Sequence, residues 1–312
     1  MKNIRTCRFL LWVAFVLLAY PASSAAQSKS PFAWETGLDL LYDDNILRYS
    51  DHDILNPKLA DLLYEPYILV QYKRVFQIYP TTFFSDLTAD FYQDNRYKNY
   101  QSLRFGLKQS LPGHSNILVS GTLMPEFHVS ETRSLRYTSL YIEGRRSMTS
   151  RLELRAGLRL GRRNYDLDRY DTDFWEPLLQ VSYQFHHIKI GGGYSYERGD
   201  ATGDTDNDPS YQEQAVHAFM TLTPARKSRV TLKYGYSARD FTTTKTTDTL
   251  RRGRSDIYNS YTLRYSHDLA RRVEGRIGVE HTGRDVSGIA PLYKSLLDYS
   301  ENSYRVGIST YW

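Results

Sequence analysis

Cysteine is nearly absent from this sequence of 312 residues, and long apolar segments are rare. The single cysteine, Cys7, precedes the single long apolar run, Phe9 to Tyr20. Disulfide and thiol chemistry are therefore excluded beyond that run. No later segment is long and apolar enough to form a transmembrane helix.

The beginning of the chain has the three parts of a secretory signal peptide. Three cations precede the apolar run, which is too short to span a bilayer comfortably, and small residues follow it. The cations are Lys2, Arg5 and Arg8, and the small residues include Ser24 and Ala26. We expect a signal peptide over residues 1–26, cleaved after Ala26, and one exported domain over residues 27–312.

A strong overall charge is also lacking. The formal net charge is +5, and it falls to about +2 without the three cations of the expected signal peptide. The basic patch at Arg251 to Arg254 lacks the aromatic platform that accompanies single-stranded nucleic-acid binding. A nucleic-acid partner is therefore not expected.

The chain is instead rich in alternation of apolar and polar residues. Over residues 151–163, one face carries Leu152, Leu154, Ala156, Leu158 and Leu160. The other face carries Arg151, Glu153, Arg155, Arg159 and Arg163. A period of two is typical of β-strands, whereas an amphipathic helix needs apolar residues at steps of three and four.

Alternation of this kind predicts about fourteen strands. They lie near residues 32–43, 61–73, 79–92, 99–110, 116–127, 135–147, 151–163, 175–187, 188–198, 211–223, 228–240, 256–267, 271–283 and 300–312. The second segment is apolar on both faces from Tyr64 to Lys73, and only a tight turn at His186-His187 separates the eighth from the ninth.

The connections between these segments are sorted by length. Every second one is short, at 112–116, 148–150, 186–187, 224–228 and 268–271. The others are mostly longer and polar, at 44–60, 164–174, 199–210, 241–255 and 284–299. Short turns on one side and long loops on the other are typical of outer-membrane barrels. A β-sandwich, the alternative, gives no reason for this sorting and has many strand edges to protect.

The last nine residues resemble the closing strand of bacterial outer-membrane β-barrels. One face of this segment carries Tyr304, Val306, Ile308, Thr310 and Trp312, and the chain ends on that tryptophan. The resemblance implies an all-β fold, a transmembrane up-and-down antiparallel barrel of about 14 strands in the cell outer membrane. It also implies that the barrel-assembly machinery recognises an assembly signal at Tyr304, Val306, Ile308 and Trp312. Outer-membrane lipid and lipopolysaccharide are the other expected partners.

A seven-residue segment follows the first expected strand, Tyr42-Asp-Asp-Asn-Ile-Leu-Arg48. It resembles a segment of exopolysaccharide-export barrels and of the barrel domain of surface lipoprotein assembly modifiers. One interpretation is a loop that packs into the lumen or binds a cation. The other is an Asx turn at a strand end, because Asp and Asn side chains bond to nearby backbone groups.

Two acidic loops have oxygen ligands of the kind that hard cations prefer. They contain Asp204, Asp206 and Asp208, and Asp166, Asp168, Asp171 and Asp173. Pro209 and Ala215 break the spacing of a calcium-binding EF-hand loop in the first of them. We therefore predict no metal site.

The polar faces of the expected strands carry charges that would line the inside of a barrel. The candidate pore-lining residues are Arg104, Lys108, Arg151, Arg155, Arg159, Arg163, Lys233, Arg264, Arg276, Glu35, Asp39, Asp86 and Asp90. They form either charged rings that set solute preference or a cross-strand network that fills the lumen, and the two interpretations are compatible.

Catalytic motifs are absent from the sequence, so an enzyme and a bound cofactor are not expected. The leading hypothesis is a porin-like channel that passes polar solutes, such as an anionic oligosaccharide or an exported polysaccharide. The alternatives are a plugged structural, assembly or surface-binding barrel without transport, and an enzyme at the barrel rim. A barrel of this strand number lies between small filled barrels and wide porins.

Overall fold

The computed structural model describes residues 31–46, 48, 59–76, 79–130, 133–166, 171–202 and 208–312. Residues 32–312 form one compact unit. The expected signal peptide lies outside the described residues.

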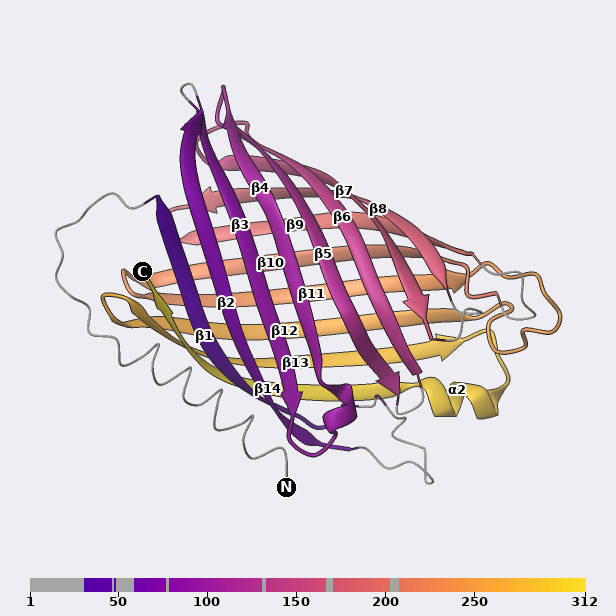
Figure 1. Cartoon of the computed structure of the whole chain (residues 1–312). Coiled ribbons are helices and arrows are strands. Elements are labelled where there is room, and N and C mark those ends of the chain that lie inside the picture. The colour runs from indigo at the N-terminus through magenta and orange to yellow at the C-terminus, as the bar shows by residue number, and fades with distance from the viewer. Residues whose placement is uncertain are drawn as a thin grey trace. The chain divides into compact units, whose positions relative to one another are not determined.

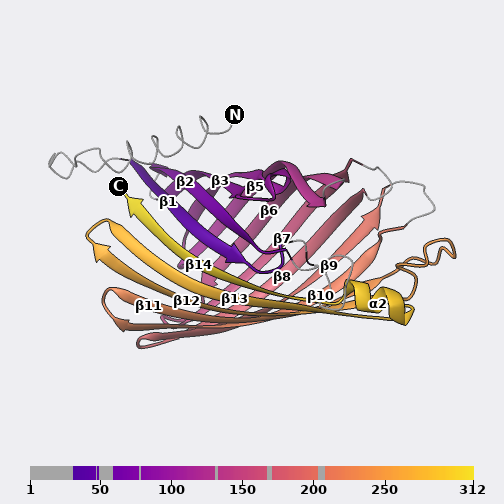
Figure 2. The same cartoon turned by 90° about the horizontal axis from the view of Figure 1, so that it is seen from below.

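The described chain forms a closed antiparallel barrel of fourteen strands, as the sequence predicts. Each strand pairs with its neighbours in the sequence, and β1 closes the barrel against β14 (Figures 1 and 2). The strands are β1 Phe32–Asp43, β2 Asp61–Phe76, β3 Tyr79–Tyr92, β4 Tyr100–Leu111, β5 Ser115–Ser130, β6 Arg133–Ser147, β7 Leu152–Tyr165, β8 Thr172–Phe185, β9 Ile188–Ala201, β10 Tyr211–Ala225, β11 Ser228–Phe241, β12 Ser255–Ala270, β13 Val273–Ser287 and β14 Tyr299–Tyr311.

In the described connections lie two short helical elements, η1 (Arg96–Lys98) and α2 (Pro291–Leu297). Within the described part of the chain, no helix has the length and apolar character needed to cross a membrane.

The two ends of the barrel differ. The turns that follow β4, β6, β8, β10 and β12 are short, and they lie at the end where β1 begins and β14 finishes. The opposite end carries the longer connections with η1 and α2 (Figure 1). One connection on that side departs from the predicted length, because β5 and β6 extend to Ser130 and Arg133.

Strand boundaries follow the alternation closely. β8 and β9 meet at the predicted His186-His187 turn, where His186 has a φ of 47°. β2 continues to Phe76 because it stays paired with β3 as far as Tyr79. β7 begins at Leu152, so Arg151 lies in the preceding turn and not on a strand.

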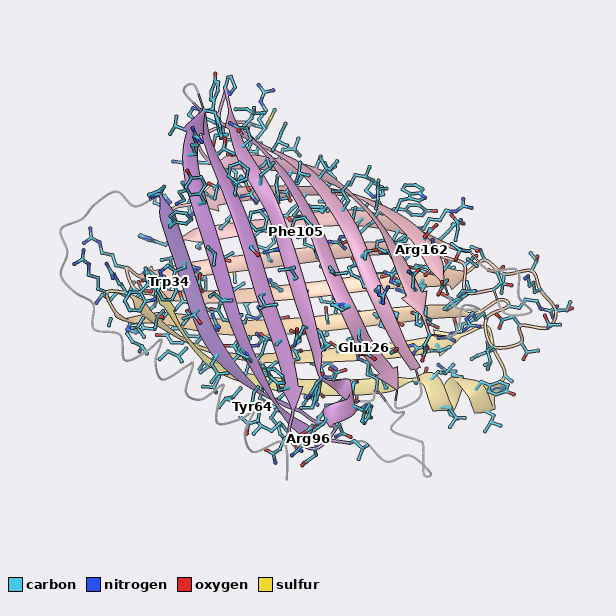
Figure 3. The ribbon with its side chains drawn as sticks, in the orientation of Figure 1. Trp34, Tyr64, Arg96, Phe105, Glu126 and Arg162 are labelled. Atoms are coloured by element: carbon cyan, nitrogen blue, oxygen red, sulfur yellow. The ribbon has the colours of Figure 1, made fainter. Side chains whose placement is uncertain are left out.

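The apolar residues of the alternating pattern face outward. In β7, Leu154, Leu158 and Leu160 are exposed, whereas Arg155 and Arg159 are half-buried and paired. Figure 3 shows the outer-face tryptophan Trp34 towards one end of the barrel and Arg162 towards the other. The barrel therefore has an apolar outer surface and a polar inner one.

Candidate channel lining

The polar faces are identified as the inner wall by ion pairs that skip a strand. Arg276 on β13 reaches past β14 to Asp39 on β1, with Nε 2.7 Å from Oδ1. Arg305 on β14 reaches past β1 to Glu65 on β2, with Nη1 3.0 Å from Oε1. Only the concave side of a closed sheet brings side chains of alternate strands this close.

A buried ion-pair cluster lies behind the seam between β1 and β14. The side chain of Asp39 is 2% exposed and accepts hydrogen bonds from Arg276 Nε and Arg305 Nη1, both at 2.7 Å. The Tyr67 hydroxyl donates to Glu35 at 2.7 Å and accepts from Arg276 at 2.9 Å. The predicted residues Glu35, Asp39 and Arg276 thus join one network across the seam.

A second cluster spans β6 and β7. Glu143 is buried and lies 3.3 Å from Arg145 Nη2 and 3.5 Å from Arg155 Nε. Glu153 lies 4.0 Å from Arg145 and 3.7 Å from Lys189 on β9. Most of these charges therefore neutralise one another.

A third cluster lies towards the end with the longer connections. Arg163 pairs with Glu197 at 3.1 Å and donates to the Tyr211 hydroxyl, which donates to the same glutamate. Arg239 pairs with Glu213 at 2.6 Å. At the same end, Asp256 forms ion pairs with Arg254, whose Nε lies 2.6 Å from Oδ1, and with Arg284, whose Nη2 lies 3.0 Å from Oδ2.

Other inward-facing charges lie in open space. Arg104 pairs with Asp86 at 3.0 Å but stays 50% exposed, and Arg264 stays 46% exposed beside Glu280 at 3.7 Å. Both arginines therefore keep about half of their side-chain surface accessible on the inner wall, unlike the buried Asp39. Among the described residues, no acidic partner lies within ion-pair distance of the inward-facing cations Lys108, Arg229 and Lys233.

The structure divides the sequence-predicted lining residues into groups. Glu35, Asp39, Arg155, Arg163 and Arg276 belong to the clusters described above, and Arg159 pairs with Glu176 at 2.7 Å. The remaining inward-facing members are Asp86, Asp90, Arg104, Lys108, Lys233 and Arg264, and Asp90 is buried. Arg151 is the exception, since it lies exposed in the β6–β7 turn.

Sequence reasoning missed a repeated stack on the inner wall, in which an aromatic ring lies against a glycine of the neighbouring strand. A methyl group on any of these glycines would overlap the ring. An arginine guanidinium lies over each ring, and we call this arrangement a Gly–ring–Arg stack. The described residues form four such stacks, Gly37–Tyr67–Arg276, Gly157–Tyr141–Arg159, Gly161–Phe174–Arg163 and Gly199–Tyr211–Arg239.

The segment after β1 forms the predicted Asx turn, in which Asp43 Oδ1 accepts a hydrogen bond from the Asn45 backbone N–H at 2.8 Å. The same segment crosses the barrel seam. Asp44 accepts from both the backbone and the side chain of Asn302 at 2.7 Å, and Arg48 pairs with Glu301 at 2.9 Å. The segment therefore ties β1 to β14 beyond the last ladder pair.

Lys98 in η1 anchors this segment from the other side. Its ammonium donates to the backbone carbonyl of Ile46, and both residues are buried. Burial and the nearby Arg48 guanidinium lower the pKa of Lys98 to about 8, against the opposing effect of Asp43 and Glu301.

The described parts of the acidic loops serve local structure. Asp166 accepts from the Ser134 backbone at 3.1 Å, and Asp171 from the Tyr165 backbone at 2.6 Å. Burial opposes ionisation of Asp208, but hydrogen bonds from Ser210 and Thr243 leave its pKa below the usual value. No cluster of three potential metal ligands occurs among the described residues, and Asp168, Asp204 and Asp206 lie outside them.

The carboxy-terminal strand presents its apolar row outward. Tyr304, Val306 and Ile308 are exposed, while Trp312 stacks on Trp34 at 5.1 Å between ring centroids. The two tryptophans also exchange backbone hydrogen bonds of 3.3 and 2.9 Å. The terminal aromatic residue therefore closes the seam as well as ending the chain.

Comparisons with known proteins identify the fold. No family model and no curated protein matches the sequence. The outer membrane channel DcaP of Acinetobacter baumannii is similar, with a TM-score of 0.55, 10% identity, and coverage of 90% of this chain and 96% of that one. The anion-selective porin from Comamonas acidovorans gives a TM-score of 0.50 and 11% identity, over 90% of this chain and 98% of that one. The chain therefore has the fold of outer-membrane porins.

Proposed function

We propose that the chain is an outer-membrane channel that passes polar solutes along the charged inner wall of its barrel. The observation that carries the proposal is the exposure of inward-facing charges such as Arg104 and Arg264 inside a closed sheet. A filled lumen would bury these two arginines, just as the ion-pair cluster behind the seam buries Asp39. The apolar outer surface is suited to lipid, and one of the two similar barrels is an outer membrane channel.

Anionic solutes are the proposed class. The paired arginines contribute little net charge, whereas Lys108, Arg229 and Lys233 have no acidic partner among the described residues. Fixed cations lower the entry barrier for solutes of opposite charge in a narrow, poorly screened space. The resemblance of Tyr42 to Arg48 to exopolysaccharide-export barrels extends the proposal to anionic oligosaccharides and exported polysaccharide.

A plugged structural barrel is the second candidate. It is favoured by the buried clusters around Asp39 and Glu143 and by the Gly–ring–Arg stacks, which fill part of the lumen. This candidate predicts no solute flux.

The third alternative, an enzyme at the barrel rim, has no support from the comparisons. Both similar barrels carry the name of a porin or channel and not of an enzyme.

Liposome swelling separates the two candidates. Purified barrel is inserted into liposomes, which are diluted into isotonic arabinose or galacturonate. An open channel should allow swelling in both solutes, and swelling should be faster in galacturonate. Protein-free liposomes provide the control. Liposomes that keep their size in both solutes would support the plugged barrel.

A further inference from the structure

At one described place on the inner wall, aromatic rings lie against glycines but no arginine covers them. Phe219 and His217 on β10 lie against Gly191 and Gly193 of β9 in the same way as the four capped rings. Both rings are only half-buried. In the described part of the chain, no arginine, lysine or second ring stacks on either of them.

The uncapped rings form a flat step on the wall. Successive inward positions on one strand share a face, so Phe219 and His217 stand side by side. His217 Nε2 lies 3.4 Å from Gln180 Oε1 on β8, which fixes the edge of its ring. Each ring therefore packs against a glycine of β9, and no described cation or second ring covers the rest of its surface.

Cations border this step on both sides. Lys233 is the register partner of Phe219 on β11, so their Cβ atoms lie about 5 Å apart. Lys233 is exposed and has no acidic partner among the described residues. Arg155 is the register partner of Gln180, and its Nε lacks a hydrogen bond although it is 3.5 Å from Glu143.

We propose that Phe219, His217 and Lys233 form a binding site for an acidic sugar residue on the inner wall. This inference rests on the proposed function and specifies its solute. The C–H face of a sugar ring packs on an exposed aromatic face, which buries apolar area without requiring a hydrogen bond. The carboxylate of the same sugar accepts a charge-assisted hydrogen bond from Lys233. A neutral sugar has the first contact only.

Calorimetry on the detergent-solubilised barrel tests the site independently of transport. Trigalacturonate is the acidic probe, maltotriose the neutral saccharide and citrate the anion without a sugar ring. We expect trigalacturonate to bind about tenfold more tightly than either, because maltotriose lacks the carboxylate and citrate lacks the sugar ring.

Two variants and a matched control locate the site. Lys233→Gln should weaken trigalacturonate binding about tenfold and leave maltotriose unchanged. Phe219→Leu keeps the bulk over Gly191 but removes the flat ring, so it should weaken both saccharides. Arg229→Gln removes another unpaired inward cation from the same strand, nearer the turn, and should leave both affinities unchanged. Heat-modifiable migration in electrophoresis checks that each variant is folded.

The outcomes separate this inference from the proposed function. Equal binding of citrate and trigalacturonate, or equal loss in Arg229→Gln and Lys233→Gln, would overturn the saccharide site. A barrel that allows liposome swelling but binds no trigalacturonate would also overturn it and would leave the channel intact. Binding without swelling would retain the site and reject the channel.

Discussion

At the scale of single residues, burial decides how much each ion pair contributes. Asp39 is 2% exposed and holds two arginines, whereas Asp86 is 25% exposed and its partner Arg104 is 50% exposed. Asp39→Ala should lower the free energy of unfolding by roughly 3 kcal/mol, because it leaves Arg276 and Arg305 confined without their carboxylate. Asp86→Ala, the matched control, should cost less than about 1 kcal/mol.

Urea unfolding in lipid vesicles, followed by tryptophan fluorescence, measures both losses. Equal effects of the two substitutions would show that the cluster behind the seam is no more important than a solvated pair.

Lys98 provides a pH-dependent contribution at the same scale. The folded protein has a pKa of about 8 for this group, against 10.5 for an ordinary lysine, so between these pH values the unfolded state binds more protons. The free energy of unfolding therefore gains a contribution that grows from pH 8 to pH 10.5. Lys98→Met should abolish this rise, measured as the pH dependence of the difference between variant and wild type.

Lys294 supplies the control for that measurement. Hydrogen bonds to Asp285 and Asp298 raise its pKa, so Lys294→Met should leave the difference nearly constant over the same pH interval. If the free energy of unfolding of Lys98→Met changed with pH in parallel with that of the wild type, Lys98 would not have the lowered pKa expected from its burial.

At the scale of the strand, alternation was enough to predict position and facing. The predicted segment 151–163 corresponds to β7, Leu152–Tyr165, and its apolar row faces outward. The end of β2 was harder to predict. Both faces of the segment from Tyr64 to Lys73 are apolar, so alternation gives no sign of where strand pairing ends. Arg151 was assigned to a strand because it continues the alternation, but backbone turn geometry sets the boundary.

The inner wall was less predictable than the strands. Asp39 and Arg276 are 237 positions apart, and their contact follows from closure between β1 and β14 and not from any local pattern. The Gly–ring–Arg stacks depend on register between neighbouring strands, which a single strand does not specify. A glycine on the polar face of one segment beside an aromatic residue on the next is the signal that could have indicated them.

The facing of β7 can be tested along its whole length. Spin labels placed one at a time over 152–163 should show lipid-soluble quenching with a period of two, strongest at Leu154 and Leu158. Leu158→Arg should then cost roughly 2–4 kcal/mol if this residue lies near the bilayer midplane, with Leu158→Met as the control. Strongest quenching at Arg155 and Arg159 would reverse the assignment.

The terminal strand has one predicted role, as an assembly signal, and one observed role, in closing the seam, and variants can separate the two. Trp312→Ala should reduce insertion into the outer membrane of cells, because it removes both the predicted assembly signal and the stack on Trp34. Trp34→Ala removes the same stack and leaves the carboxy-terminus intact. Insertion is measured as the protease-resistant, heat-modifiable fraction.

A larger insertion defect in Trp312→Ala than in Trp34→Ala is expected for an assembly signal. Equal defects would assign the whole effect to seam closure, and normal insertion of both variants would reject both roles.

At the scale of the whole molecule, the inner wall combines tightly paired regions with open ones. The seam and the end with the longer connections are packed by ion pairs and stacked rings, whereas Arg104, Lys233 and Arg264 remain exposed between them. Charge on the exposed groups acts on a solute because it is not already neutralised within the wall. We therefore expect a few exposed cations, and not the total number of arginines, to set the ion selectivity.

Single-channel recording in planar bilayers under a potassium chloride gradient tests this central claim most directly. We expect stable conductance and a reversal potential with the sign of anion preference. Combined replacement of Lys108, Arg229 and Lys233 by Gln should move that potential towards cation preference without loss of the folded barrel. A folded wild-type barrel that carried no current, or that preferred cations, would contradict the account.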